Sequence, residues 1–117
     1  MRILLTGLLG LVVIASAGCA IANKLSGVSE ARAIQAVGQQ ADAVVLQVWD
    51  TGITVNDDPV VGLLVEIAAE NRPPYQVKIE KSLVSRVHIP QVQPGSRVPV
   101  YIDPKNPNRV ALGLYRY

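Results

Sequence analysis

The sequence predicts a mainly all-β protein: a small antiparallel barrel or partly open barrel of five to six strands, preceded by an N-terminal apolar signal or anchor helix and a short connector helix. Three observations carry this prediction. Residues 3–22 are uncharged and apolar, residues 25–37 repeat apolar positions every three to four residues, and a period of two begins at residue 41. Strand patterns at intervals of about eight to twelve residues are typical of small sandwiches and barrels. A chain this short is best protected from exposed strand edges by closure into a barrel.

Residues 1–22 form the first predicted unit, a signal peptide or membrane anchor. Arg2 opens the apolar run, and the small residues Ser16, Ala17 and Gly18 lead to Cys19, the only cysteine. This order is typical of a signal peptide. Small residues directly before a cysteine resemble a bacterial lipobox, where the chain is cut ahead of the cysteine and the cysteine is acylated. We therefore expect lipidation of Cys19.

Two alternatives to the lipid anchor stay open. A helix over the twenty residues of the apolar run would span about 30 Å, enough for an uncleaved membrane anchor. Ordinary cleavage after Ala17 or Ala22 would instead release a soluble domain. The basic residues that flank the run are nearly balanced and do not fix its orientation. We expect the domain to be exported, on the periplasmic or cell-surface side.

Residues 23–40 are predicted to be a connector, with a short amphipathic helix. Its apolar positions are Leu25, Val28, Ala31, Ile34 and Val37, at the spacing of one helix face. Such a helix could lie on the membrane or lid the following domain. Because it has few large apolar residues, we favour a stalk.

The barrel is predicted over residues 41–117, from alternating patterns separated by turn residues. Turns are expected at 50–52, 56–59, 70–74, 94–95 and 103–108, which are rich in Gly, Pro, Asn and Asp. Val44, Leu46 and Val48 share one face of the first strand, opposite Val45, Gln47 and Trp49. The inward positions expected of the later strands are Val61, Leu63, Val65, Ile67; Tyr75, Val77, Ile79; Val87, Ile89; Val98, Val100, Ile102; and Val110, Leu112, Leu114.

The end of the chain carries a family resemblance. Gly95 leads into Val98-Pro99-Val100, which is followed by Asp103-Pro104 and by Pro107 before the last strand. This pattern resembles the closing signature of the bacterial domain-of-unknown-function family 3592, and the resemblance extends over about residues 38–114. It implies a small membrane-tethered β domain and no known reaction or catalytic residue.

The sequence offers no catalytic constellation, and we expect no enzyme, no cofactor and no metal. His88 is the only histidine, and its position between Val87 and Ile89 predicts an exposed structural role. Asp57 and Asp58 are explained by turn formation, without further ligands for a calcium loop. Nucleic acid is not an expected partner, because the net charge is only +2 and aromatic residues are scarce.

Charge is distributed unevenly along the chain. Residues 30–71 contain seven acids and one base, whereas residues 72–117 contain eight bases and two acids. Pairing between neighbouring strands is the simpler interpretation. The alternative is a basic face that meets anionic lipid or an acidic protein, formed by Lys78, Lys81, Arg86, Arg97 and Arg109.

Together these patterns predict a non-enzymatic, membrane-tethered lipoprotein module for protein-protein or membrane-surface interaction in the bacterial envelope. Its expected partners are the membrane, through the N-terminal segment, and an envelope protein or anionic lipid. The alternatives are a small-ligand or cell-wall binding domain with a pocket at the barrel mouth, and an uncleaved single-span membrane protein of unknown role. A flat apolar patch would favour a protein partner, and a concave polar pocket would favour a ligand.

Overall fold

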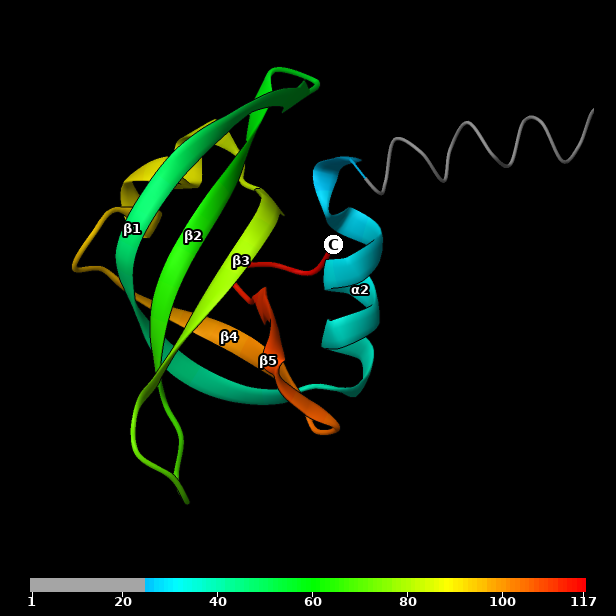
Figure 1. Cartoon of the computed structure of the whole chain (residues 1–117). Helices are drawn as coiled ribbons and strands as arrows, with labels where there is room; N and C mark the ends of the chain where they lie inside the picture. Colours follow the sequence, from blue (N-terminus) through cyan, green and yellow to red (C-terminus); the bar gives the residue numbers. More distant parts are fainter. Residues whose placement is uncertain (1–24) are drawn as a thin grey trace, which may run out of the picture.

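The computed structural model describes residues 25–117 (Figure 1). The predictions for residues 1–22, including lipidation of Cys19, concern residues outside this part of the chain. The elements follow in the order α2 (Val28–Val37), β1 (Gln39–Val55), β2 (Asp58–Ala68), β3 (Tyr75–Leu83), the 3₁₀ helix η1 (Arg86–Val92), β4 (Arg97–Asp103) and β5 (Asn106–Leu112).

The five strands form one antiparallel sheet in the order β3-β2-β1-β4-β5. Strand β1 is 17 residues long, and it belongs to both halves of the sheet. Its first part, from Gln39 to Val44, pairs with β4, and the part from Asp42 onward pairs with β2. Because one strand bends between two partners, the sheet curls and brings β3 next to β5. The predicted small barrel is therefore confirmed, as a nearly closed barrel of five strands behind a helix.

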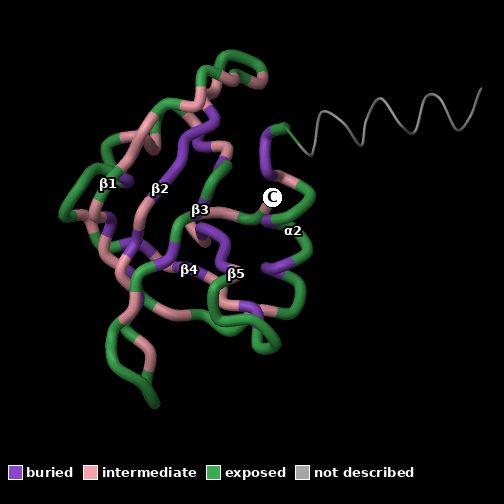
Figure 2. Tube along the Cα trace, in the orientation of Figure 1, coloured by how far each residue is buried: buried purple, intermediate pink, exposed green. Residues whose placement is uncertain are grey.

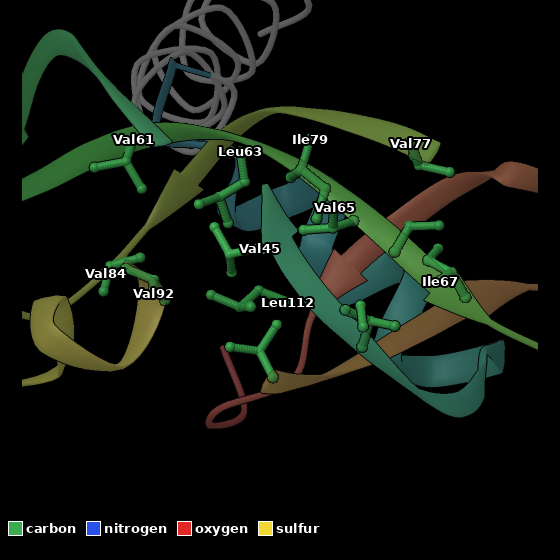
Figure 3. Packing of buried hydrophobic residues seen from close by; sticks show 14 residues of the cluster. Val45, Val61, Leu63, Val65, Ile67, Val77, Ile79, Val84, Val92 and Leu112 are labelled. Atoms are coloured by element: carbon green, nitrogen blue, oxygen red, sulfur yellow. The ribbon is translucent and has the colours of Figure 1, made fainter. Parts of the chain in front are cut away.

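The core is aliphatic and consists largely of valine (Figure 3). Its buried residues are distributed over the strands of the barrel (Figure 2). In β2 the predicted inward residues Val61, Leu63, Val65 and Ile67 are all buried. Val77 and Ile79 of β3, Val98 and Val100 of β4, and Val110 and Leu112 of β5 meet them inside the barrel. These alternating faces confirm the period-two prediction for β2, β3 and β4, and for Val110 and Leu112 of β5. The bounds predicted for the last strand are wrong, because β5 begins at Asn106, inside the predicted turn, and ends at Leu112, before Leu114.

The predicted faces of β1 are wrong because the strand contains a bulge. The register with β2 shifts between Val45 and Gln47, so that Leu46 is the extra residue. A bulge moves every later side chain to the opposite face. Val45 before the bulge and Val48 after it both pack in the core, although they are three residues apart. Trp49 lies on the outer face, beside Lys78 and Leu64.

The hairpin from β1 to β2 turns at Asn56 and Asp57, whose φ angles of 51° and 68° are both left-handed. Two such residues are typical of the hairpin turn that matches the twist of the flanking strands. The tight reversal predicted at residues 56–59 is confirmed. At residues 50–52, where a turn was predicted, β1 continues, and its register with β2 shifts in a bulge between Asp50 and Ile53.

The segment predicted as an alternating strand around His88 is instead the 3₁₀ helix η1. Val87 was expected to point inward, but it is 77% exposed. His88 was expected to be exposed and is partly buried, with its ring 5.3 Å from that of Tyr115. The physical reason is that Pro90 cannot donate a ladder hydrogen bond.

Helix α2 packs on the outside of the barrel and is not a stalk. Ala31 and Ile34 are buried against Ala111 of β5, with Tyr101 and Tyr117 beside them. At its start, Gly27 lies so close to β3 that an added Cβ would be 2.2 Å from the carbonyl oxygen of Lys81. The lid alternative is thus the correct one, and the helix is part of the folded unit.

The junction between β3 and β5, which we call the seam, is held by side chains. No backbone ladder joins the two strands. At one end, the Tyr75 hydroxyl donates to the carbonyl of Pro107 at 2.8 Å. At the other, the hydroxyls of Tyr115 and Tyr117 both donate to the carbonyl of Leu83 at 2.7 Å. The C-terminal residues therefore close the barrel where the sheet does not.

The buried side chain of Gln35 fixes these C-terminal residues to α2. Its Nε2 donates to the carbonyls of Leu112 and Tyr115, at 3.1 and 3.0 Å. Its Oε1 accepts the backbone N–H of Tyr117 at 3.2 Å. Burial raises the pKa of the Tyr117 hydroxyl, so this group stays protonated and able to donate.

Candidate functional site

The five basic residues singled out in the sequence do not form one face. Lys78 and Lys81 lie on β3, Arg86 on η1, Arg97 at the start of β4, and Arg109 on β5. The structure brings Lys78, Lys81 and Arg109 to a groove of about 440 Å³ between α2, β3 and β5. Arg86 and Arg97 do not line this groove.

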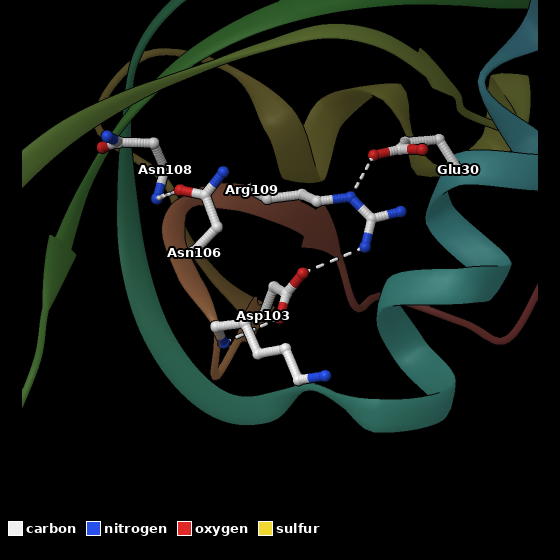
Figure 4. Close-up of polar contacts among 6 residues, drawn as sticks. Glu30, Asp103, Asn106, Asn108 and Arg109 are labelled. Carbon is white, nitrogen blue, oxygen red and sulfur yellow. Dashed lines mark hydrogen bonds and ion pairs between the residues drawn. The ribbon is translucent and has the colours of Figure 1, made fainter.

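Arg109 is paired with acids of its own domain (Figure 4). Its guanidinium contacts Glu30 of α2 through Nε and Asp103 of β4 through Nη1, at 2.5 and 3.0 Å. The hydrogen bond from Arg109 lowers the pKa of Glu30. The pKa of Asp103 is lowered first by the backbone N–H of Lys105 and then by Arg109. Arg109 thus connects the helix to the sheet, as the internal-pairing interpretation requires.

Arg86 also makes contacts within the domain. Its backbone N–H donates to the carboxylate of Asp58 at 3.1 Å, and its Nε donates to the carbonyl of Asp57. These bonds hold η1 against the tip of the β1–β2 hairpin. Asp57 and Asp58 therefore serve turn and loop contacts, as the sequence predicted.

Lys78 lies on the outer side of the sheet, where its Nζ is 5.4 Å from the centre of the Trp49 ring. Among residues 25–117, neither Lys78 nor Lys81 has a carboxylate within ion-pair distance. Arg97 is likewise exposed and has no ion pair within residues 25–117. An external partner is therefore consistent with the surroundings of Lys78, Lys81 and Arg97, but not with those of the internally paired Arg109.

Trp49 is a candidate binding residue that the sequence analysis did not single out. Its ring lies flat over Gly62 of the neighbouring strand, where an added Cβ would be 2.1 Å from Cε2 of the indole. Gln47, Leu64 and Lys78 surround the ring in a shallow hollow of about 340 Å³. A lone glycine inside the apolar β2 pattern was the available signal, because such a glycine often marks a close approach.

His88 contacts Tyr115 through its ring, and its Nδ1 is buried without a hydrogen-bond partner. In the described part of the chain, no three His, Cys, Asp or Glu residues are grouped so that they could hold a metal ion.

Over residues 25–117, no helix is long and apolar enough to cross a membrane. Comparisons with protein-family models, with curated proteins and with solved structures find no significant match to this chain.

Proposed function

We propose that this chain is a non-enzymatic, membrane-tethered β-barrel module of the bacterial envelope, and that it binds a protein partner through the outer surface of β1, β2 and β3. The apolar segment at residues 3–22, with the lipobox-like approach to Cys19, supports the tether.

The observation that carries the proposed binding surface is the position of Trp49. It lies on the outer side of a strand, where a solvent-facing sheet normally presents polar residues. Its ring is only partly buried, and Leu64 beside it is also partly exposed. Tryptophan is strongly enriched among the residues that dominate binding energy at protein interfaces. A rigid aromatic ring supported from below by the Gly62 backbone is suited to that role.

The charges around Trp49 favour a protein over an anionic lipid surface. Lys78 borders the ring, but Glu80 lies two residues further along the same strand and Glu66 lies two residues from Leu64. Residues separated by two share a face of a strand. An anionic membrane would attract the lysine and repel the two acids. A protein surface can complement both signs, which gives specificity.

The test places a photo-crosslinking amino acid at Gln47, in the full-length protein in its native membranes. Gln47 is exposed next to Trp49. The same group at Ser29, exposed on α2, is the matched control. We expect a discrete protein adduct from Gln47, none from Ser29, and loss of the Gln47 adduct when Trp49→Ala is added. Adducts of equal yield from both positions, or an adduct insensitive to Trp49→Ala, would refute the proposed surface.

A further inference from the structure

A second groove lies where β1 and β2 separate. The two strands stay paired down to Asp42 opposite Ala68. Beyond this pair β1 continues toward Gln39 beside β4, whereas the chain after Ala68 leaves the sheet into the β2–β3 loop. The resulting groove has a volume of about 870 Å³ and is lined by both segments and by Ile102. Because β1 begins at Gln39, two residues after the end of α2 at Val37, the groove lies near the C-terminal end of that helix.

The backbone of Gln40 faces this groove. In an antiparallel strand, the N–H and C=O groups of successive residues point to alternate sides. Val45 directs both of its groups toward the β4 side, where it bonds Ser96 and Gly95. Even-numbered positions before it therefore point toward β2, which agrees with Asp42 lying opposite Pro99, a residue without an N–H. Asp42 has Ala68 on that side, but Gln40 has no ladder partner there.

The walls of the groove suit an extended peptide. Ala41, Ala68 and Ala69 are small, so another backbone can approach closely. Around them are polar side chains that make no hydrogen bond or ion pair within residues 25–117. They are Gln39, Gln40, Asp42, Glu70 and Asn71. An unpaired strand edge flanked by such groups is the setting for strand addition, in which the main chain supplies affinity and side chains supply selectivity.

The charges of the groove select the kind of peptide. Asp42 from β1 and Glu70 from the loop are exposed and unpaired acids. The cation among the lining residues, Arg72, has its guanidinium stacked 4.0 Å from the ring centre of Tyr75. The groove thus carries one net negative charge, which favours a cationic ligand.

We propose that this groove binds a short extended peptide bearing a free ammonium group, with the peptide main chain paired to Gln40 and the ammonium group close to Asp42 and Glu70. The ammonium group can come from a lysine side chain or from a peptide N-terminus. With one strand residue for main-chain pairing, the dissociation constant of a short peptide is on the order of 1 mM. This site is separate from the Trp49 surface and does not depend on it.

The test titrates the full-length protein in lipid nanodiscs with tripeptides and follows backbone amide shifts by NMR. The probes are an acetylated and amidated alanine-lysine-alanine peptide, which has a side-chain ammonium, and an amidated trialanine with a free N-terminus. The capped alanine-glutamine-alanine peptide is the neutral control. We expect saturable shifts at Gln40 and Asn71 with one or both ammonium peptides, and binding at least about fivefold weaker for the neutral peptide. The better of the two ammonium peptides identifies the source of the charge.

The variants Asp42→Asn and Glu70→Gln separate this site from nonspecific attraction. Combined, they should remove the preference for the ammonium peptides, whereas Glu80→Gln, an exposed acid outside the groove, should keep it. The proposal is overturned if no peptide shifts Gln40 in the unmodified protein, if the neutral peptide binds equally well, or if Glu80→Gln abolishes the preference. The first two outcomes use the unmodified protein and do not depend on a variant folding.

Discussion

Replacing Gly62 by alanine is expected to push Trp49 off the sheet. The new Cβ would lie 2.1 to 2.4 Å from three atoms of the indole, which is far inside van der Waals contact, so the ring must move. A tryptophan buries roughly 150 to 250 Å². If about 100 Å² of it is exposed again, the loss is about 2.5 kcal/mol at about 25 cal/mol per Å². Alanine in a strand recovers about 0.5 to 1 kcal/mol relative to glycine, so we expect a net destabilisation of about 1.5 to 2 kcal/mol.

Trp49 reports its own displacement, because it is the only tryptophan in the chain. In Gly62→Ala its fluorescence should shift to longer wavelength and become more accessible to a soluble quencher, and urea unfolding should give the free-energy change. In a Trp49→Leu background, Gly62→Ala no longer places its Cβ against an indole ring. There it should be neutral or stabilising by about 0.5 to 1 kcal/mol. An equal loss of stability in both backgrounds would refute the assignment of the clash to Trp49.

Three further predictions concern the helix contacts, the C-terminal residues and the tether. The depressed pKa values of Glu30 and Asp103 contribute stability that is present above their unfolded pKa values and lost as the pH falls through the folded ones. Between about pH 5 and pH 3, Arg109→Gln should therefore lose less stability than the unmodified protein, as measured by urea unfolding at each pH. Gln35→Ala leaves buried backbone groups without partners and should cost about 2 kcal/mol, a fall of roughly 10 °C in the thermal midpoint. Cys19→Ala should abolish incorporation of a lipid precursor, and detection of the unmodified protein with its N-terminal residues intact would contradict the lipid anchor.

Matched controls make the first two of these decisive. Lys81→Gln removes a base of the same groove that has no ion-pair partner in residues 25–117, and its acid sensitivity should match that of the unmodified protein. Equal pH profiles for Arg109→Gln and Lys81→Gln would contradict the role of the Arg109 pairs. For Gln35, the exposed neighbour Ala36 is the control position, and Ala36→Ser should leave the midpoint within about 2 °C.

The alternating residues of β2, β3, β4 and β5 were predictable because one face of each strand is buried and the period is two. The faces of β1 were not, since a single extra residue at Leu46 reverses the pattern and alternation carries no signal for where the extra residue sits. Pro90 was visible in the sequence, but the strand prediction in this segment rested on the β-branched residues on either side of His88. The local alternation of apolar residues predicted β2 correctly, but it predicted a strand where the chain forms η1.

The candidate site depended on register, which local pattern does not fix. That Gly62 lies opposite Trp49 follows from the hairpin turn together with the bulge between Asp50 and Ile53. Likewise, the charge asymmetry between the two halves of the chain was evident, but whether Arg109 or Lys78 would find an acid depended on where α2 packs. The amphipathic pattern predicted the helix and its apolar face, whereas its docking on β5 required the small side chain of Ala111.

The seam is the line along which this barrel is expected to open first. A backbone ladder breaks cooperatively, whereas the tyrosine hydrogen bonds to Leu83 and Pro107 can break separately, each with a modest net free energy. Local opening along this line should therefore precede global unfolding, as in other proteins with regions of unequal stability. Gln35 links the same C-terminal residues to α2, and the N-terminal segment joins the domain at the start of that helix. Tension on the segment consequently reaches the seam through α2, before it reaches the paired strands β1 and β2.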